Sequence, residues 1–156
     1  CNHPDLVDKY KGSCYFLQTS RMVQLFGVDF KKVATACSSA PPNYQRTCFE
    51  SMGRDVGGVY RGNPATGIAA CSNAAYGAMR IGCLIGAAQD AFWDSSGQDN
   101  ALTFCKLLTN KSEKEACYNI IFARAPDVLS SKNELQTFCA KAENEYQNLC
   151  LMRIRS

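Results

Sequence analysis

The chain has 156 residues, enough for one domain with a hydrophobic core, and its 46% of hydrophobic residues excludes a disordered chain as the default. Its 17 basic and 14 acidic residues lie spread along the sequence and give a formal net charge of +3. This is not the clustered basic charge that is typical of a nucleic-acid-binding protein. No apolar run approaches the roughly 18 residues that a transmembrane helix needs. We therefore expect a folded protein that has neither a nucleic-acid partner nor a membrane span.

Longer and shorter helical segments are expected to alternate along the chain. In chain order, the expected helices cover residues 9–26, 29–38, 44–60, 65–73, 77–94, 98–109, 113–130, 132–142 and 144–154. Pro41 and Pro42 end the second segment, because proline cannot continue a helix. Pro126 falls inside the segment 113–130, where it predicts a kink or a break.

Nine of the ten cysteines fall into two series that share one period. One series has steps of 34, 35, 34 and 33, and the other has three steps of 34. The first series is Cys14, Cys48, Cys83, Cys117 and Cys150, and the second is Cys37, Cys71, Cys105 and Cys139. A period near 34 residues is typical of helical hairpins in an α-solenoid. The predicted fold is all-α: one domain, 1–156, with repeats at about 9–43, 44–76, 77–112 and 113–143 and a terminal helix at 144–156.

The residues around the cysteines keep the same register. A large apolar residue follows each cysteine of the first series: Tyr15, Phe49, Leu84, Tyr118 and Leu151. A tyrosine stands four positions before three of these cysteines: Tyr10, Tyr44 and Tyr146. A turn-prone residue stands eight positions before each cysteine of the second series: Asp29, Asn63, Gly97 and Ser131. Glycine is frequent between residues 53 and 88, which predicts close helix packing in the middle of the chain, since glycine otherwise disfavours helices.

An even number of cysteines at this density predicts five disulfides and an extracytoplasmic location: secreted, periplasmic or cell-surface. No two cysteines are closer than 11 positions, so zinc-binding and redox C-x-x-C pairs are absent. Cys1 has a second interpretation as a lipidated terminal residue, which would leave one other cysteine unpaired. We favour its interpretation as the remnant of an earlier repeat, and hence no lipid anchor.

Two disulfide patterns fit a row of helical hairpins. The short pattern joins each shorter helix to the next longer one: Cys1–Cys14, Cys37–Cys48, Cys71–Cys83, Cys105–Cys117 and Cys139–Cys150. The long pattern joins the two helices of one hairpin: Cys14–Cys37, Cys48–Cys71, Cys83–Cys105 and Cys117–Cys139. The long pattern leaves Cys1 and Cys150 at opposite ends of the array, too far apart to pair readily. Because an unpaired thiol is unusual in a secreted chain, the short pattern is favoured.

The layout resembles the Sel1-like and tetratricopeptide α-solenoids, and among them the bacterial cysteine-rich Sel1-like proteins. The stretch Gly58–Gly62, followed by Ala69-Ala70-Cys71, is similar to the Sel1 pattern, whereas the other repeats lack it and the cysteine spacing is longer than in that family. The resemblance implies disulfides that join a shorter helix to the next longer one, and a binding role. It assigns no functional residue.

No catalytic constellation is visible. His3 is the only histidine, which removes two-histidine metal sites and most nucleophile–histidine pairs. Asp55 and Asp90 stand seven positions after a cysteine, where two other repeats have Arg21 and Arg124. Surface charge or Asp–Arg contacts between neighbouring repeats explain them better than paired catalytic acids. We expect no enzyme activity, no catalytic residue, no metal and no cofactor.

The expected function is a non-catalytic extracytoplasmic module for protein–protein interaction or structure, with a protein or peptide partner. Candidate contact residues are the aromatic side chains Tyr60, Phe92, Trp93 and Phe122. Asn110-Lys111-Ser112 is a glycosylation sequon in an expected turn. The alternatives are a subunit of a larger exported or membrane-associated assembly, an accessory domain of a secreted enzyme, and a thiol-based metal-storage protein.

Overall fold

The computed structural model describes residue 1 and residues 3–154, and these residues form helices and no strand. The helices are α1 Asp8–Phe26, α2 Phe30–Ser38, α3 Pro42–Val59, α4 Pro64–Cys71, α5 Ala78–Ala91, the 3-10 turn η1 Ser95–Gly97, α6 Gln98–Leu107, α7 Lys111–Val128, α8 Lys132–Ala140 and α9 Asn144–Arg153. The all-α prediction is confirmed, and each expected segment overlaps one observed α-helix. Residues 155 and 156 of the expected terminal helix lie outside the described part of the chain.

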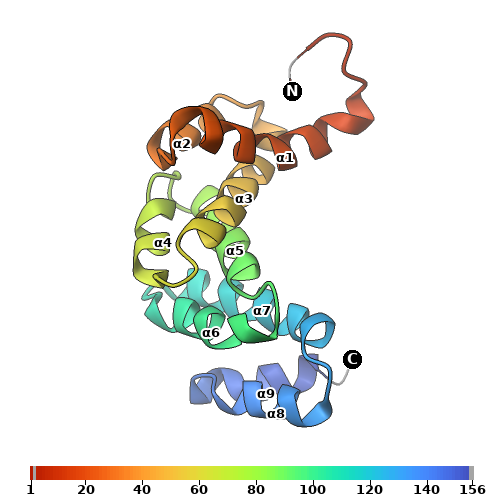
Figure 1. Ribbon diagram of the computed structural model, residues 1–156, viewed down its shortest axis with the longest axis vertical. Helices are drawn as coiled ribbons and strands as arrows, with labels where there is room; N and C mark the ends of the chain where they lie inside the picture. The colour runs from red at the N-terminus through yellow and green to blue at the C-terminus, as the bar shows by residue number, and fades with distance from the viewer. Residues whose placement is uncertain (2, 155–156) are drawn as a thin grey trace.

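The helices form an arch that is open on one side (Figure 1). The odd-numbered helices contact one another in succession, α1 with α3, α3 with α5, α5 with α7 and α7 with α9. The shorter helices α2, α4 and α6 follow the convex side, so that α3, α5 and α7 line the concave side (Figure 1). The described ends of the chain lie far apart, at the two ends of the arch.

The turn-prone residues that precede the second cysteine series are helix N-caps. The side chains of Asp29, Asn63 and Ser131 accept hydrogen bonds from the backbone N–H three residues later, at 3.1–3.2 Å. Glu134 completes a capping box with Ser131 at the start of α8. The fourth member, Gly97, lies at the N-cap of α6 and has no side chain to donate or accept. These positions therefore fix where the shorter helices begin.

Glycine lets α3 and α5 approach at backbone distance. A Cβ atom at Gly53 would stand 2.0 Å from the carbonyl oxygen of Cys83, and one at Gly86 would stand 2.1 Å from that of Glu50. Gly57 faces the carbonyl oxygen of Ala87 in the same way, at 2.6 Å. No side chain fits at these distances, so the predicted role of glycine in close packing is confirmed for this helix pair.

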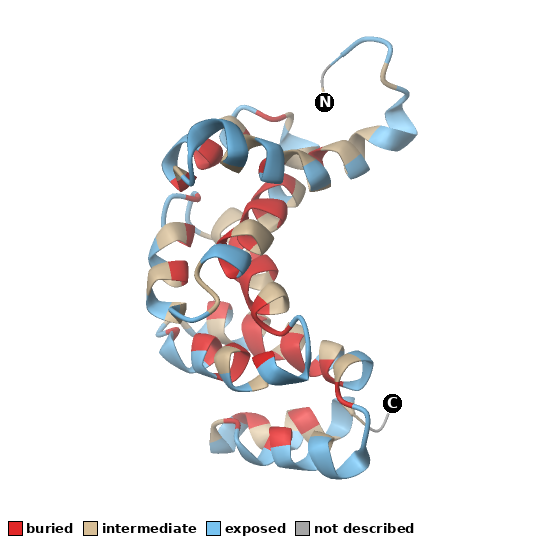
Figure 2. Cartoon of the chain, in the orientation of Figure 1, coloured by how far each residue is buried: buried red, intermediate tan, exposed pale blue. Residues whose placement is uncertain are grey.

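The hydrophobic core runs along the arch instead of surrounding one centre (Figure 2). Its largest fully buried side chains come from successive helices and loops: Phe49, Phe92, Tyr118, Phe122 and Phe138. Phe92 stacks on Phe138 with ring centroids 5.0 Å apart, and Phe138 meets Phe122 edge-on at 6.0 Å. These rings pack α8 against α7 and against the segment that follows α5.

Two details of the expected helices are wrong. The helix expected over 77–94 ends at Ala91, where the chain turns. Gly97 packs directly on this helix end: a Cβ atom at Gly97 would stand 2.2 Å from the carbonyl oxygen of Ala91. Phe92 and Trp93 therefore follow α5 instead of lying in it. Of the kink or break expected at Pro126, the break does not occur: α7 runs through this residue, and the N–H of Leu129 bonds to the carbonyl of Ala125 at 2.8 Å.

Candidate functional site

Five disulfides link neighbouring segments of the chain. They join Cys1–Cys14, Cys37–Cys48, Cys71–Cys83, Cys105–Cys117 and Cys139–Cys150, with Cα atoms 5.4–5.6 Å apart. These are the pairs of the short pattern, and no cysteine is free. Cys1 and Cys14 are partly exposed, whereas the cysteines of the other four pairs are buried. Five disulfides indicate an oxidising, extracytoplasmic setting.

Of the four aromatic residues expected to contact a partner, one is open to solvent. Phe92 and Phe122 are fully buried core residues, so burial contradicts their prediction as contact residues. Tyr60 is half-buried, with its ring 5.8 Å from that of Phe30. Trp93 is 63% exposed, although it is adjacent to fully buried Phe92.

Asn110, the expected glycosylation site, is the N-cap of α7. Its side-chain oxygen accepts from the N–H of Glu113 at 3.1 Å, and its amide nitrogen donates to the hydroxyl of Tyr76 at 2.6 Å. The nitrogen that would carry a glycan is thus engaged within the fold. A glycan there would leave this nitrogen one hydrogen for the contact to Tyr76.

A small pocket opens between α3, α5 and α7, the helices of the concave side. Arg54, Gln89, Asp90, Trp93 and Arg124 line it, and we call it the Arg–Trp pocket; its volume is about 110 Å³. Four of these residues stand six or seven positions after a cysteine of the first series, so corresponding positions of successive long helices meet here. Asp90, Trp93 and Arg124 stood out in the sequence, whereas Arg54 and Gln89 were not predicted to share a site. The sixth position after the cysteine was the signal that could have identified them.

Arg54 is held by contacts to α1. Its guanidinium group lies over the ring of Phe16, 3.8 Å from the centroid. Nη2 donates to the carbonyl oxygen of Phe16 and to the hydroxyl of Ser51, the latter at 3.3 Å. Its Nε is buried and has no hydrogen-bond acceptor within the described residues. The group is therefore fixed in orientation but has no anionic partner in the described part of the chain.

Arg124 is held from the opposite wall. Its Nε donates to the carbonyl oxygen of Phe92 at 2.6 Å, and Nη2 donates to that of Trp93 at 3.4 Å. The guanidinium lies 5.8 Å from the centroid of the Trp93 ring, within cation–π range. Both of its acceptors are neutral carbonyls, so its charge is also left without an anion among the described residues.

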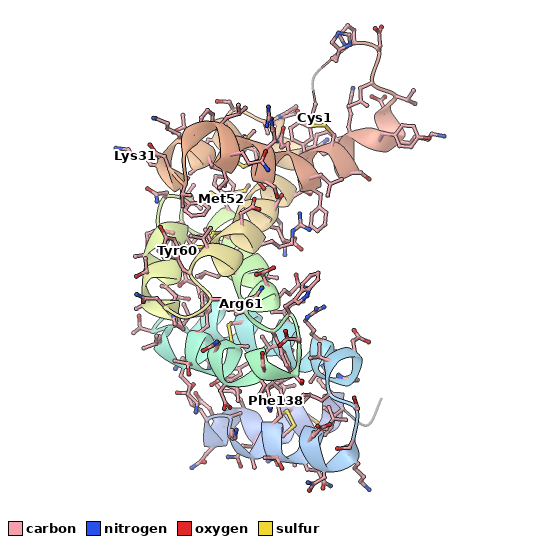
Figure 3. All side chains as sticks on the ribbon, viewed as in Figure 1. Cys1, Lys31, Met52, Tyr60, Arg61 and Phe138 are labelled. Carbon is pink, nitrogen blue, oxygen red and sulfur yellow. A yellow bond between two sulfur atoms is a disulfide. The ribbon has the colours of Figure 1, made fainter. Side chains whose placement is uncertain are left out.

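The two aspartates that share a position have different partners. Asp90 forms an ion pair with Arg61, labelled in Figure 3, at 3.0 Å. Asp55 instead accepts hydrogen bonds from the hydroxyls of Thr19 and Ser20, both at 2.6 Å. The expected Asp–Arg contact is therefore found for Asp90, whereas Asp55 joins α3 to α1 through hydroxyl groups.

A larger hollow of about 650 Å³ lies at the C-terminal end of the arch, between the end of α7, α8 and α9. Its apolar lining is Pro126, Leu129, Leu135, Leu151 and Ile154. Leu151 follows Cys150 as Tyr118 follows Cys117, but it is only partly buried because no further helix covers it in the described structure.

His3 is exposed, with its ring nitrogen 3.5 Å from the carboxylate of Asp5. Within residues 1 and 3–154, no group of three or more His, Cys, Asp or Glu side chains is placed to hold a metal ion. A search of the same residues finds no helix with the length and hydropathy of a membrane span. No protein-family model, curated protein or solved structure matches the chain. The resemblance to Sel1-like repeats thus rests on the cysteine period and one short stretch of sequence.

Proposed function

We propose that the chain is a non-catalytic α-solenoid that binds a segment of a protein partner on its concave side, outside the cytoplasm, in a secreted, periplasmic or cell-surface setting. The observation that carries the proposal is the Arg–Trp pocket. It combines an exposed tryptophan with two arginines that lack anionic partners in the described residues, on the side of the arch that the long helices line.

The solenoid interpretation is supported by contacts that recur along the chain. Tyr15 stacks on Tyr44 with ring centroids 4.8 Å apart, and Tyr118 stacks on Tyr146 at 4.2 Å. Both contacts join the residue after one cysteine to the residue four positions before the next cysteine of the same series. A recurring contact of this kind is expected when each hairpin packs only on its neighbours.

The size and composition of the Arg–Trp pocket favour a protein partner over a small substrate. Pockets for drug-sized ligands enclose about 300–1,000 Å³, and this pocket is well below that range. Tryptophan and arginine are enriched among the residues that contribute most to protein–protein binding. A pocket that accepts one side chain, set in a long curved surface, suits an extended peptide segment.

A peptide selection would test the proposal. Peptides selected from a random library on the oxidised protein should slow amide hydrogen exchange in α3, α5 and α7 and leave α4 and α6 unchanged. Selection of no peptide, or protection confined to α4 and α6, would refute binding on the concave side. The single tryptophan, Trp93, should also change its fluorescence on binding.

The ends of the arch favour a second candidate, a subunit of a larger assembly. Tyr10 occupies the position of Tyr44 and Tyr146 but is 53% exposed, and no ring among the described residues stacks on it. Leu151 and the apolar hollow at the other end are likewise uncovered by described residues. Light scattering after size exclusion would separate the candidates: a stable monomer at micromolar concentration argues against an obligate subunit made of copies of this chain.

A further inference from the structure

We infer that the Arg–Trp pocket binds a carboxylate of the partner, from a glutamate or aspartate side chain or from a free C-terminus. This inference deepens the proposed function and rests on it. Its basis is a charge imbalance, a fixed geometry and a size limit at one place on the concave side.

Arg54 and Arg124 differ from Arg61 and Arg80, which form ion pairs with carboxylates of the chain. Arg61 pairs with Asp90 at 3.0 Å and Arg80 pairs with Glu113 at 2.7 Å. Arg54 and Arg124 donate only to neutral carbonyl and hydroxyl oxygens within the described structure. Because a carbonyl carries no net charge, each guanidinium can strengthen its hydrogen bonding by gaining an anionic acceptor.

The geometry is set before a ligand arrives. Arg54 is stacked on Phe16, and Arg124 is tied to the chain that follows α5. Both anchors are stabilised by the core, since Phe92 is fully buried and Ser51 is fully buried. A ligand that meets two oriented guanidinium groups does not have to order them, which lowers the entropic cost of binding.

The volume of about 110 Å³ admits the end of one side chain and excludes a larger group. Trp93 is 63% exposed beside it, which offers an apolar face to the methylene groups of an acidic side chain. The pocket therefore suits a short alkyl stem that ends in a planar anion, which a carboxylate provides.

Asp90 adds a local repulsion that grows with the negative charge of the ligand. Its carboxyl group lies in the wall of the pocket and is paired with Arg61. Together with Arg54 and Arg124, these groups supply three positive charges and one negative charge. A monoanion meets less repulsion from Asp90 than a phosphate, whose charge at neutral pH is between −1.5 and −2.

The test uses the full oxidised chain and blocked tetrapeptides, followed by Trp93 fluorescence and by titration calorimetry. Acetylated, amidated tetraglutamate should bind, and its tetraglutamine counterpart should not. Tetraglycine with a free C-terminus, compared with its amide, shows whether a terminal carboxylate suffices. Inorganic phosphate is the competing anion and should bind more weakly than tetraglutamate.

The variants Arg54→Gln and Arg124→Gln should each weaken tetraglutamate binding by roughly tenfold, because each removes a charged hydrogen-bond donor. Arg21→Gln is the matched control: it removes the same charge at the repeat position of Arg124, is exposed, and does not line the pocket. Its affinity should equal that of the wild type. Circular dichroism checks that each variant is folded. If Arg54→Gln does not fold, Arg124→Gln alone tests the inference.

Equal binding of tetraglutamate and tetraglutamine overturns the inference, as does equal weakening by Arg21→Gln and Arg124→Gln. The proposed function can survive that result. If library peptides protect α3, α5 and α7 but bind Arg124→Gln as tightly as the wild type, the concave side binds a partner without using a carboxylate. Protection confined to α4 and α6 would instead refute the proposed function itself.

Discussion

Tyr118 stacks on Tyr146 with ring centroids 4.2 Å apart, and its hydroxyl donates to Oε2 of Glu143 at 2.9 Å. The side chain of Tyr118 thus joins α7 both to α9 and to Glu143, the residue that precedes α9. Tyr15 and Tyr44 form the corresponding stack between α1 and α3, at 4.8 Å. Because these contacts join successive long helices, changes at them should act on the stability of the arch.

Replacing Tyr118 by Phe keeps the ring and removes the hydroxyl. The stack on Tyr146 is retained and the hydrogen bond to Glu143 is lost, so the free energy of unfolding should fall by about 1 kcal/mol, the usual net value of a hydrogen bond. Urea denaturation would measure the change. Tyr10→Phe is the control, because Tyr10 is exposed, and it should leave the stability unchanged. Equal stabilities for Tyr118→Phe and the wild type would contradict the assignment.

Glu143 should make the stability depend on pH in the acid range. Burial alone would raise the pKa of its carboxyl group, but hydrogen bonds from Lys114 and Tyr118 outweigh burial and lower that pKa. A lowered pKa in the folded state stabilises the fold above the ordinary glutamate pKa, and this contribution is lost as the pH falls through the folded-state pKa.

The difference in unfolding free energy between the wild type and Glu143→Gln should therefore be constant near neutral pH. It should shrink as the pH drops below about 4.3, the ordinary pKa of glutamate. Denaturation at a series of pH values measures it, with Glu145→Gln on the exposed side of α9 as the charge-matched control. A difference that grew in acid would mean that the contacts to Lys114 and Tyr118 do not stabilise the anion.

Gly53→Ala and Gly12→Ala should have opposite effects. A Cβ at Gly53 would stand 2.0 Å from the carbonyl oxygen of Cys83, so α3 and α5 would have to separate, which should cost about 3 kcal/mol or more. A Cβ at Gly12 meets nothing within 4 Å, and there alanine should stabilise α1 by up to about 1 kcal/mol. Thermal denaturation of both variants measures this. A neutral Gly53→Ala would show that the two helices are not in close contact.

The helices and the disulfide pattern could be predicted from sequence because the features that set them are local. Asn63 caps α4 through a bond to a residue three positions away, and Cys71 and Cys83 are 12 positions apart. A period of 34 residues repeated such signals often enough to locate the helices. Glycine at positions 53 and 86 also indicated close packing, since few other reasons retain glycine in a helix.

The candidate site was predicted only in part because it depends on long-range packing. Phe92 and Trp93 are neighbours with opposite exposures, and which of them faces the core is set by the end of α5, where Gly97 packs on Ala91. Arg54 receives its orientation from Phe16, 38 positions away. Neither relationship has a local signal, so the aromatic pair could be located in the sequence but not divided into core and surface.

The disulfides should differ in how readily they are reduced in the folded protein. Thiol–disulfide exchange needs access of the attacking thiolate to a sulfur atom. Cys1 and Cys14 are partly exposed, whereas the cysteines of the other four pairs are at most 1% exposed. Mild reduction followed by alkylation and peptide mass analysis should therefore label Cys1 and Cys14 first.

Reduction of the Cys1–Cys14 bond should leave the rest of the arch intact. The loop that this bond closes contains only the residues before α1 and the first turns of α1, and the other four disulfides lie further along the chain. The double variant Cys1→Ser/Cys14→Ser should lose less stability than Cys71→Ser/Cys83→Ser, for which about 2–4 kcal/mol is expected from the loss of a buried disulfide. Reduction in urea is the control, since unfolding exposes all five bonds and should abolish the order of labelling. Early labelling of Cys71 or Cys83 in the folded protein would contradict the burial that sets this order.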